Sequence, residues 1–387
     1  MSMETIPLSV PCLEGNAERY LRECVETNFV SSVGPFVGRF EVEFAARAGA
    51  GHAVACANGT AALHVALKVA GVGPEDDVLV SDFTFVATVN PITYLGARPV
   101  LVDADLATWN LAPDFVVAEL ERRARAGAKM PKAVLAAHIL GLPADLASVA
   151  EACARHGVVL VEDAAEALGA SYASGPLAGR QVGTVGLLGC FSFNGNKIIT
   201  TGGGGMIATA DGALAKRAKH LTTQARLPGP EYLHDEIGFN YRLTNLNAAL
   251  GVAQLEKLGA FIERKRAIAA RYDEALANLP GVTVPPRPSW AGPTLWLYSI
   301  LVDPEEAGLD RKALFERLAA EGIETRPVWA PAHLMPFYRD APRLGGAVGE
   351  RLFAQGLSLP CSVSLTEAQQ ERVIESLLAH LAEAGAC

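Results

Sequence analysis

The stretch VVLVEDAAE at residues 158–166 joins an uninterrupted apolar run to acidic side chains that follow it directly. A short continuous apolar run is typical of a strand buried on both faces, as in a parallel sheet covered by helices. Further apolar runs lie at residues 78–80, 99–102 and 133–137, and helical patterns lie at residues 114–125 and 145–156. This alternation, from about residue 50 to 210, predicts an α/β fold with a mainly parallel sheet.

The pattern changes in the C-terminal third of the chain. Residues 245–275 are rich in Ala, Leu, Glu and Lys, which predicts one long helix or two joined helices. A proline-rich break then leads to a strand-like run at 295–302, and a helical pattern follows at 366–384. We therefore expect three parts: an N-terminal segment (1–25) packing with the small domain, a large α/β domain (26–250) and a smaller α+β C-terminal domain (251–387).

The composition is that of an ordinary globular protein of 387 residues, half of them apolar. The formal net charge of −9, with no cluster of Lys and Arg, argues against nucleic acids and anionic membranes as partners. Seven scattered cysteines without a C-x-x-C pair favour reduced thiols in a cytoplasmic protein. No apolar stretch approaches the ~18–20 residues that a membrane span requires. We expect a soluble cytoplasmic enzyme or binding protein.

Ligands of open α/β sheets bind at the carboxyl ends of the strands. Asp163 follows the apolar strand 158–161, where a carboxylate can bond to a protonated ring nitrogen, as in enzymes that use pyridoxal phosphate (PLP). The alternative is an aspartate that caps the next turn. Asn58-Gly59-Thr60-Ala61 stands at a predicted helix start, where N–H groups, a hydroxyl and the helix dipole can hold a phosphate. A plain helix cap is the alternative there.

Lys197 lies between an apolar strand and four consecutive glycines, residues 202–205. Burial in such a loop would lower the lysine pKa, as Schiff-base chemistry requires, whereas the alternative is a solvated surface lysine. Ser192 can add a hydroxyl to the phosphate site. The glycine run fits G-x-G-x-x-A but leads into a strand-like run, so the dinucleotide-binding fingerprint is a false match and an NAD-dependent oxidoreductase is disfavoured. No metal-binding motif such as H-E-x-x-H occurs, and we expect no metal.

The order of phosphate turn, strand-end aspartate and glycine-flanked lysine resembles the DegT/StrS-type sugar aminotransferases, a family of fold-type-I PLP enzymes. The resemblance covers nearly the whole chain. It rests on FVSSVG (29–34), NGTAAL (58–63), TFVAT (84–88), EDAA (162–165), the segment from Ser192 to Lys197 and GFNYR (238–242). It implies a large domain with a mainly parallel sheet, a smaller α+β C-terminal domain and pyridoxal 5'-phosphate as the cofactor.

The resemblance also implies a role for individual residues. Lys197 would hold PLP as a Schiff base and then shuttle the proton between half-reactions. Asp163 would pair with the pyridinium nitrogen, Glu166 would approach the phenolic oxygen and Phe85 would stack on the ring. The phosphate would be held by Gly59, Thr60, Ala61 and Ser192.

Further residues are implied at the subunit interface and the substrate site. Asn240 would reach the phosphate of a neighbouring subunit, which implies a homodimer with shared active sites. Arg242 would organise the interface or the substrate mouth, and Ser31 and Asn194 would also contact substrate. His333 lies in a proline-punctuated loop that lines the sugar site in relatives; the alternative is a packed loop histidine.

The string NGNKIITTGGGG (194–205) resembles the branch that makes 4-amino-4,6-dideoxy sugars for polysaccharide biosynthesis, as in bacillosamine and legionaminic acid pathways. The implied reaction passes an amino group from L-glutamate to the C4 ketone of a UDP-linked 4-keto-6-deoxy sugar. Three alternatives stay open: a GDP-4-keto-6-deoxymannose substrate (perosamine type), a 3-keto sugar, and a non-catalytic PLP-binding regulator. Some relatives replace the lysine by histidine and become dehydratases, and Lys197 argues against that.

Overall fold

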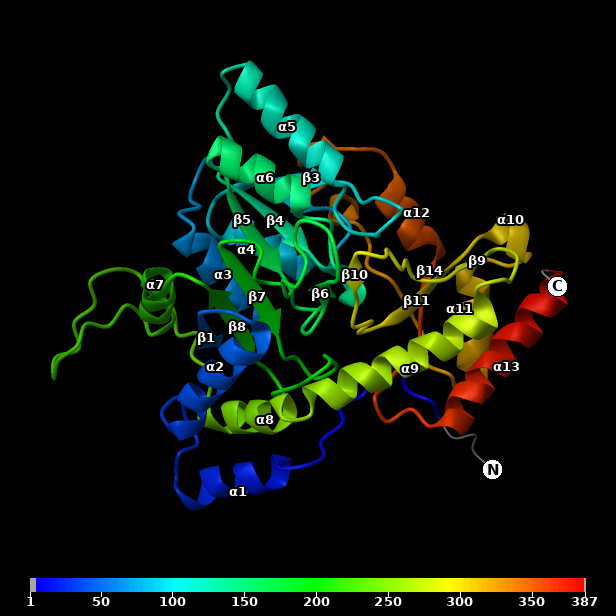
Figure 1. The fold of residues 1–387 in the computed structure, drawn as a ribbon, viewed down its shortest axis with the longest axis horizontal. Coiled ribbons are helices and arrows are strands. Elements are labelled where there is room, and N and C mark those ends of the chain that lie inside the picture. The colour runs from blue at the N-terminus through cyan, green and yellow to red at the C-terminus, as the bar shows by residue number, and fades with distance from the viewer. Residues whose placement is uncertain (1–4, 386–387) are drawn as a thin grey trace.

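An eight-stranded sheet forms the centre of the large domain in the computed structural model, which describes residues 5–385 (Figure 1). The strands are β1 (His52–Cys56), β2 (Asp77–Ser81), β3 (Arg98–Val102), β4 (Ala133–Ala137), β5 (Val159–Asp163), β7 (Leu188–Ser192), β8 (Gly205–Thr209) and β13 (Arg343–Leu344). Their order is β1-β8-β7-β5-β4-β2-β3-β13. Only β8 runs antiparallel to its neighbours, β1 and β7. The predicted α/β fold with a mainly parallel sheet is confirmed.

Helices cover both faces of this sheet. They are α2 (Pro35–Ala48), α3 (Gly59–Val69), α4 (Asn90–Tyr94), α5 (Pro113–Arg125), α6 (Ala147–His156) and α7 (Gly212–Thr222), with the 3-10 helices η1 (Val86–Thr88) and η2 (Ile139–Gly141). Successive strand residues point to opposite faces. In β2, Leu79 lies in the core under α5 and α6, whereas Val78 and Val80 lie in the core under α3 and α7. Burial on both faces explains why the strands read as continuous apolar runs.

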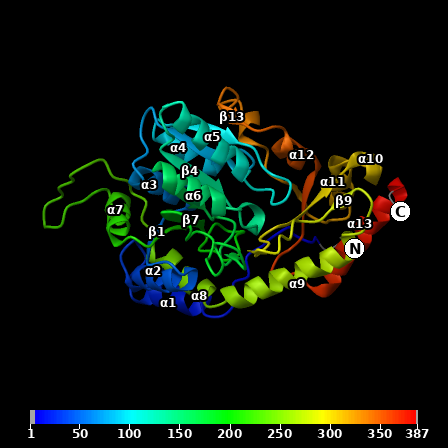
Figure 2. The ribbon, with the colours of Figure 1, turned by 45° about the horizontal axis from the view of Figure 1, so that its top comes forward.

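The run after residue 245 forms two joined helices, α8 (Asn245–Leu255) and α9 (Leu258–Leu276), and α9 leads from the large domain to the small one (Figure 1). The small domain contains an antiparallel sheet in the order β12-β14-β11-β9, with helices beside it (Figure 2). Its elements are β9 (Val282–Thr283), β11 (Tyr298–Val302), α10 (Pro304–Ala307), α11 (Arg311–Ala320), β12 (Arg326–Pro327), η3 (Ala332–Leu334), α12 (Val348–Gln355), β14 (Gly356–Leu359) and α13 (Glu367–Ala384). Between the domains, β6 (Ser171–Tyr172) pairs with β10 (Ala291–Gly292).

Two segments cross the predicted domain boundaries. Of the N-terminal segment, Ile6 and Leu8 hydrogen-bond to the small domain, whereas α1 (Ala17–Glu26) packs on α8. Residues 1–4 of that segment lie outside the described residues. In the other direction, β13 extends the large sheet by pairing with β3. Among the described residues, no helix has the length and apolar character needed to span a bilayer.

Candidate active site

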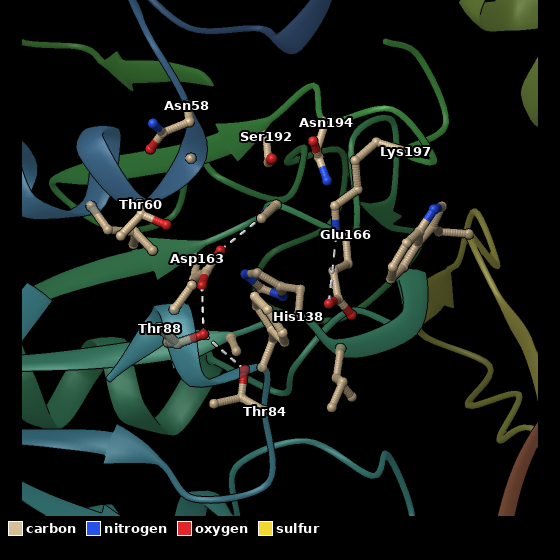
Figure 3. A pocket seen from close by; sticks show the side chains of 18 of the residues that line it. Asn58, Thr60, Thr84, Thr88, His138, Asp163, Glu166, Ser192, Asn194 and Lys197 are labelled. Carbon is tan, nitrogen blue, oxygen red and sulfur yellow. Dashed lines mark hydrogen bonds and ion pairs between the residues drawn. The ribbon is translucent and has the colours of Figure 1, made fainter. Parts of the chain in front are cut away.

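A cavity of about 290 Å³ lies at the carboxyl ends of the central parallel strands (Figure 3). Ala137, Asp163 and Ser192, the last residues of β4, β5 and β7, all line it. The lining is completed by Asn58, Gly59, Thr60, Leu63, Thr84, Phe85, Ala87, Thr88, His138, Ile139, Ala165, Glu166, Asn194, Asn196, Lys197, Gly204, Trp296 and Trp329. The two tryptophans come from the C-terminal part of the chain, so both domains build the cavity.

Lys197 points into this cavity and is not a solvated surface residue (Figure 3). Its side chain is 13% exposed, and Nζ lies 3.7 Å from Glu166 Oε1. Nζ also lies 3.7 Å from the ring centre of Trp296. Burial lowers the pKa of the Lys197 ammonium, although the charges of Glu166 and Asp163 oppose this. A lysine that is easier to deprotonate is the form that can act as a nucleophile or a base.

Asp163 is buried at the end of β5 and uses its two carboxylate oxygens differently. Oδ1 accepts a hydrogen bond from the Ala165 N–H at 3.0 Å, which caps the turn after the strand. Oδ2 accepts one from the Thr88 hydroxyl at 2.7 Å. Burial raises the pKa of Asp163, and the Thr88 hydrogen bond is the main influence that lowers it. A cation in the cavity would therefore be a favourable partner for this carboxylate.

The hydroxyl of Thr88 also lies 2.8 Å from that of Thr84, and both side chains are buried. Because Thr88 donates its proton to Asp163, Thr84 must donate to Thr88. The two threonines thus form a chain of hydrogen bonds that orients the carboxylate. Within the motif TFVAT (84–88), a role was predicted from the sequence only for Phe85. The role of the two threonines could have been found from their position just after β2, because this places their hydroxyls at the same sheet edge as Asp163.

Glu162 precedes Asp163 but points to the opposite face of β5, as strand geometry requires. It accepts hydrogen bonds from the N–H groups of Gly183, Val185 and Gly186 at 2.6–2.8 Å. His138 Nε2 lies 3.0 Å from Glu162 Oε2, and His138 Nδ1 accepts from the N–H of Ala144. His138 therefore carries its proton on Nε2 and donates it to Glu162. This buried pair holds the loop beneath the cavity in place.

Glu166 is fixed at the other side of the cavity, beside Lys197. Its Oε2 accepts a hydrogen bond of 2.7 Å from the N–H of Leu140, which adopts a left-handed backbone conformation with φ 57°. Burial raises the pKa of Glu166, whereas the charge of Lys197 lowers it. The carboxylate and the ammonium therefore stabilise each other inside the cavity.

The end of the cavity at the start of α3 is suited to an anion. Asn58 Oδ1 accepts a hydrogen bond from the Ala61 N–H at 2.8 Å and caps the helix. Within residues 5–385, the N–H groups of Gly59 and Thr60 form no hydrogen bond, as is usual in a first helical turn. A Cβ atom at Gly59 would lie 2.8 Å from Ser192 Cβ, so glycine permits this close approach. Ala61 does not line the cavity, unlike the other three predicted phosphate contacts.

Phe85 and Asn194, two further predicted residues, also line the cavity. Phe85 is 50% exposed, and its ring centre lies 5.2 Å from that of Trp329. An exposed aromatic ring at a cavity wall offers a flat surface to a planar ligand. Trp329 and Trp296 were missed by the sequence analysis, since no local pattern connects them to the large sheet.

Besides Ala61, four predicted residues do not line the cavity in the part of the chain that the structure describes: Ser31, Asn240, Arg242 and His333. The carbonyl of Ser31 accepts a hydrogen bond from the N–H of Asn245. Asn240 is exposed and forms a β-bridge with Thr223, at the base of the loop that follows α7, and Arg242, which bridges to Cys56, is partly buried.

The ring of His333 is enclosed by two carboxylates. Nδ1 lies 2.5 Å from Asp82 Oδ2, and Nε2 lies 3.0 Å from Glu350 Oε1. With both ring nitrogens engaged, His333 ties η3 to the end of β2. These contacts favour the alternative of a packed loop histidine.

The cavity fits pyridoxal phosphate at each point where the cofactor needs a partner. Unpaired N–H groups beside the Ser192 hydroxyl suit the phosphate, and the buried Asp163 carboxylate suits a protonated ring nitrogen. Phe85 can cover one face of the ring. The amine of Lys197, whose pKa is lowered by burial, suits covalent attachment of the cofactor aldehyde.

Comparisons with known proteins agree with this geometry. The family model described as the DegT/DnrJ/EryC1/StrS aminotransferase family matches residues 11–378. EpsN of Bacillus subtilis, whose name describes a pyridoxal phosphate-dependent aminotransferase, is 42% identical over 377 residues, which are 96% of this chain and 95% of EpsN. The GDP-perosamine synthase of Caulobacter vibrioides is 40% identical over 373 residues, 96% of this chain and 97% of that protein.

A solved structure also matches over most of both chains. It is the crystal structure of a DegT DnrJ EryC1 StrS aminotransferase from Brucella abortus, with a TM-score of 0.86 and 30% identity, covering 94% of this chain and 95% of that chain. The resemblance recognised in the sequence motifs is thereby confirmed. The chain belongs to the DegT/DnrJ/EryC1/StrS aminotransferase family and is a PLP-dependent sugar aminotransferase.

Proposed function

We propose that this enzyme transfers an amino group from L-glutamate to the C4 ketone of a nucleotide-linked 4-keto-6-deoxy sugar, with PLP attached to Lys197. The observation that carries the proposal is the convergence of Lys197, Asp163 and Glu166 on one cavity beside an anion site. When bound, PLP supplies the electron sink that allows an amino group to leave the donor.

The residues of this chain have distinct tasks in that reaction. Asp163, held by Thr88, would keep a proton on the ring nitrogen of the cofactor, because a buried carboxylate favours a cationic partner. Lys197 Nζ would accept and return the proton that moves during transfer, and its lowered pKa makes the neutral amine accessible. Glu166 would orient this amine, since its carboxylate lies 3.7 Å from Nζ.

The identity of the nucleotide is proposed from two observations that point to different bases. The GDP-perosamine synthase is 40% identical over nearly the full length, which supports a GDP-linked sugar. The string at residues 194–205 supports a UDP-linked sugar, because it resembles enzymes of the bacillosamine and legionaminic acid branch. We give the GDP-linked substrate first place, since its support extends over the whole chain.

A homodimer with shared active sites is part of the proposal. The loop between residues 223 and 242 projects beyond α7 as an arm (Figure 1). Four of its large apolar side chains are exposed in the single chain: Leu227, Leu233, Tyr232 at 80% and Ile237 at 86%. Clustered exposed apolar side chains mark an interaction surface. The family resemblance implies that Asn240, at the base of this arm, would reach the phosphate site of a second copy that covers the arm.

The test is turnover by the purified, PLP-loaded protein. GDP-, UDP- and dTDP-linked 4-keto and 3-keto sugars are supplied with L-glutamate, and the amino sugar and 2-oxoglutarate are quantified by mass spectrometry. We expect turnover of a 4-keto-6-deoxy sugar, and none with Lys197→Ala. Bleaching of the yellow cofactor absorbance by glutamate alone would separate an aminotransferase from a PLP-binding regulator. Turnover of 3-keto sugars only would contradict the proposal.

A further inference from the structure

Trp296 reaches the cavity from the small domain, just before β11, and its ring covers Lys197. The ring centre lies 3.7 Å from Lys197 Nζ, and the tryptophan is 1% exposed. The face of an indole ring attracts an ammonium group, more strongly where water is excluded. The lysine amine is thus held between the indole face and the Glu166 carboxylate, which lies on another side at 3.7 Å.

Trp296 also holds the backbone next to the lysine. Its Nε1–H donates a hydrogen bond of 2.6 Å to the carbonyl of Asn196, the residue before Lys197. One side chain therefore contacts both the amine of the lysine and the loop that carries it. A residue that only filled space would need neither the ring orientation nor this hydrogen bond.

The small domain fixes Trp296 from behind. The buried Lys265 of α9 donates hydrogen bonds to the Trp296 carbonyl at 2.8 Å and to the Cys361 carbonyl at 2.5 Å. On the other side, a Cβ atom at Gly141 would lie 2.5 Å from Trp296 N, so the two backbones meet closely. Leu295 has φ 54°, a left-handed conformation that leucine rarely adopts. The position of the indole is therefore set by contacts from both domains.

We infer that Trp296 is a positioning residue for Lys197: its indole face and its N–H fix the direction of the lysine amine, so that docking of the small domain sets the reactivity of the lysine. The inference rests on the proposed attachment of PLP to Lys197. No proton or electron is assigned to Trp296 itself, which acts only through the lysine.

The experiment compares Trp296→Phe with Trp296→Leu in the full-length protein stripped of PLP. Phenylalanine keeps a π face but loses the N–H, whereas leucine loses both. Trp290→Leu is the matched control, because Trp290 stacks on Tyr172 and does not line the cavity. The rate of covalent PLP attachment is followed by absorbance as a function of pH.

We expect Trp296→Phe to slow attachment about 5-fold, the usual effect of losing one hydrogen bond. Leucine also removes the attraction for the charged amine, so the pKa of Lys197 should fall. The attachment rate of the leucine variant should then reach half its maximum at a lower pH than that of the phenylalanine variant. This difference corresponds to an acid dissociation constant of Lys197 that is about 10-fold larger. Trp290→Leu should match the unsubstituted protein in both quantities.

Equal rates and midpoints in all four proteins would overturn the inference. If Trp296→Leu does not fold, Trp296→Phe alone decides, because an unchanged attachment rate would show that the Asn196 contact has no positioning role. Borohydride reduction followed by peptide mass mapping identifies the modified lysine in each protein. An adduct elsewhere than Lys197 would count against the proposed function, whereas an adduct on Lys197 with unchanged kinetics would count against Trp296 alone.

Discussion

Replacing Thr88 with valine would test the hydrogen-bond chain that orients Asp163. Valine has nearly the same shape as threonine, so the change removes the hydroxyl and little else. Asp163 Oδ2 then loses its 2.7 Å hydrogen bond, and within residues 5–385 the carboxylate keeps only the hydrogen bond from the Ala165 N–H to Oδ1. Thr84 simultaneously loses the group to which it donates.

The size of the effect follows from the charge of the acceptor. A hydrogen bond to a charged group contributes about 1.5–3 kcal/mol, and each pKa unit corresponds to about 1.4 kcal/mol. Burial already raises the pKa of Asp163, and Thr88 opposes that rise. Without Thr88, the pKa of Asp163 should rise further, by about one to two units. Asp163 would then become protonated, and lose its charge, at a higher pH.

The assay is the pH dependence of kcat/KM for the PLP-loaded enzyme with its sugar substrate. We expect the acid limb of the Thr88→Val profile to move to higher pH by about one unit or more. Thr84→Val is the control, because it leaves the Thr88–Asp163 hydrogen bond in place and should shift the limb less. An acid limb at the same pH in all three proteins would refute the role given to Thr88.

Three further predictions test other parts of the site. Glu166→Gln removes the negative charge beside Lys197, so the pKa of Lys197 should fall and PLP attachment should reach half its maximal rate at a lower pH. An unchanged or higher pH of half-maximal attachment would contradict this prediction. Glu162→Gln leaves at least one buried N–H without an acceptor, so the free energy of unfolding measured by urea titration should fall by about 1–3 kcal/mol. Equal stability of the two proteins would contradict the structural role given to Glu162. After subunit exchange, an equimolar mixture of Lys197→Ala and Asn240→Ala chains should recover up to about a quarter of full activity, because about half of the dimers are mixed and each of these has one of its two shared sites intact. No recovery after subunit exchange would argue against sharing.

The strands could be predicted from the sequence because burial on both faces leaves a local signature. The apolar run before Asp163 and the runs at β2 and β4 mark their own positions without reference to the rest of the chain. Since parallel strands end at one edge, the meeting of Asp163, Ser192 and Lys197 also followed from their order. Because successive side chains of β5 point to opposite faces of the sheet, Glu162 points away from the cavity and binds N–H groups within residues 183–186 instead.

The remainder of the site depends on contacts that no local pattern records. Thr88 meets Asp163 across 75 positions, and Trp296 meets Asn196 across 100. The packing of η1 against the large sheet decides the first contact, and the docking of the small domain on the large one decides the second. His333 is the opposite case, because its loop resembles one that lines the sugar site in relatives. In the structure its ring instead contacts Asp82, which follows β2.

Everything proposed for this site depends on the attachment of the cofactor to Lys197. Its most direct test is reduction of the PLP-loaded protein with borohydride, followed by digestion and peptide mass spectrometry. We expect a pyridoxyl modification on the peptide that contains Lys197, and no modified peptide when Lys197→Ala is treated in the same way. A stable adduct on another lysine, with Lys197 unmodified, would contradict it.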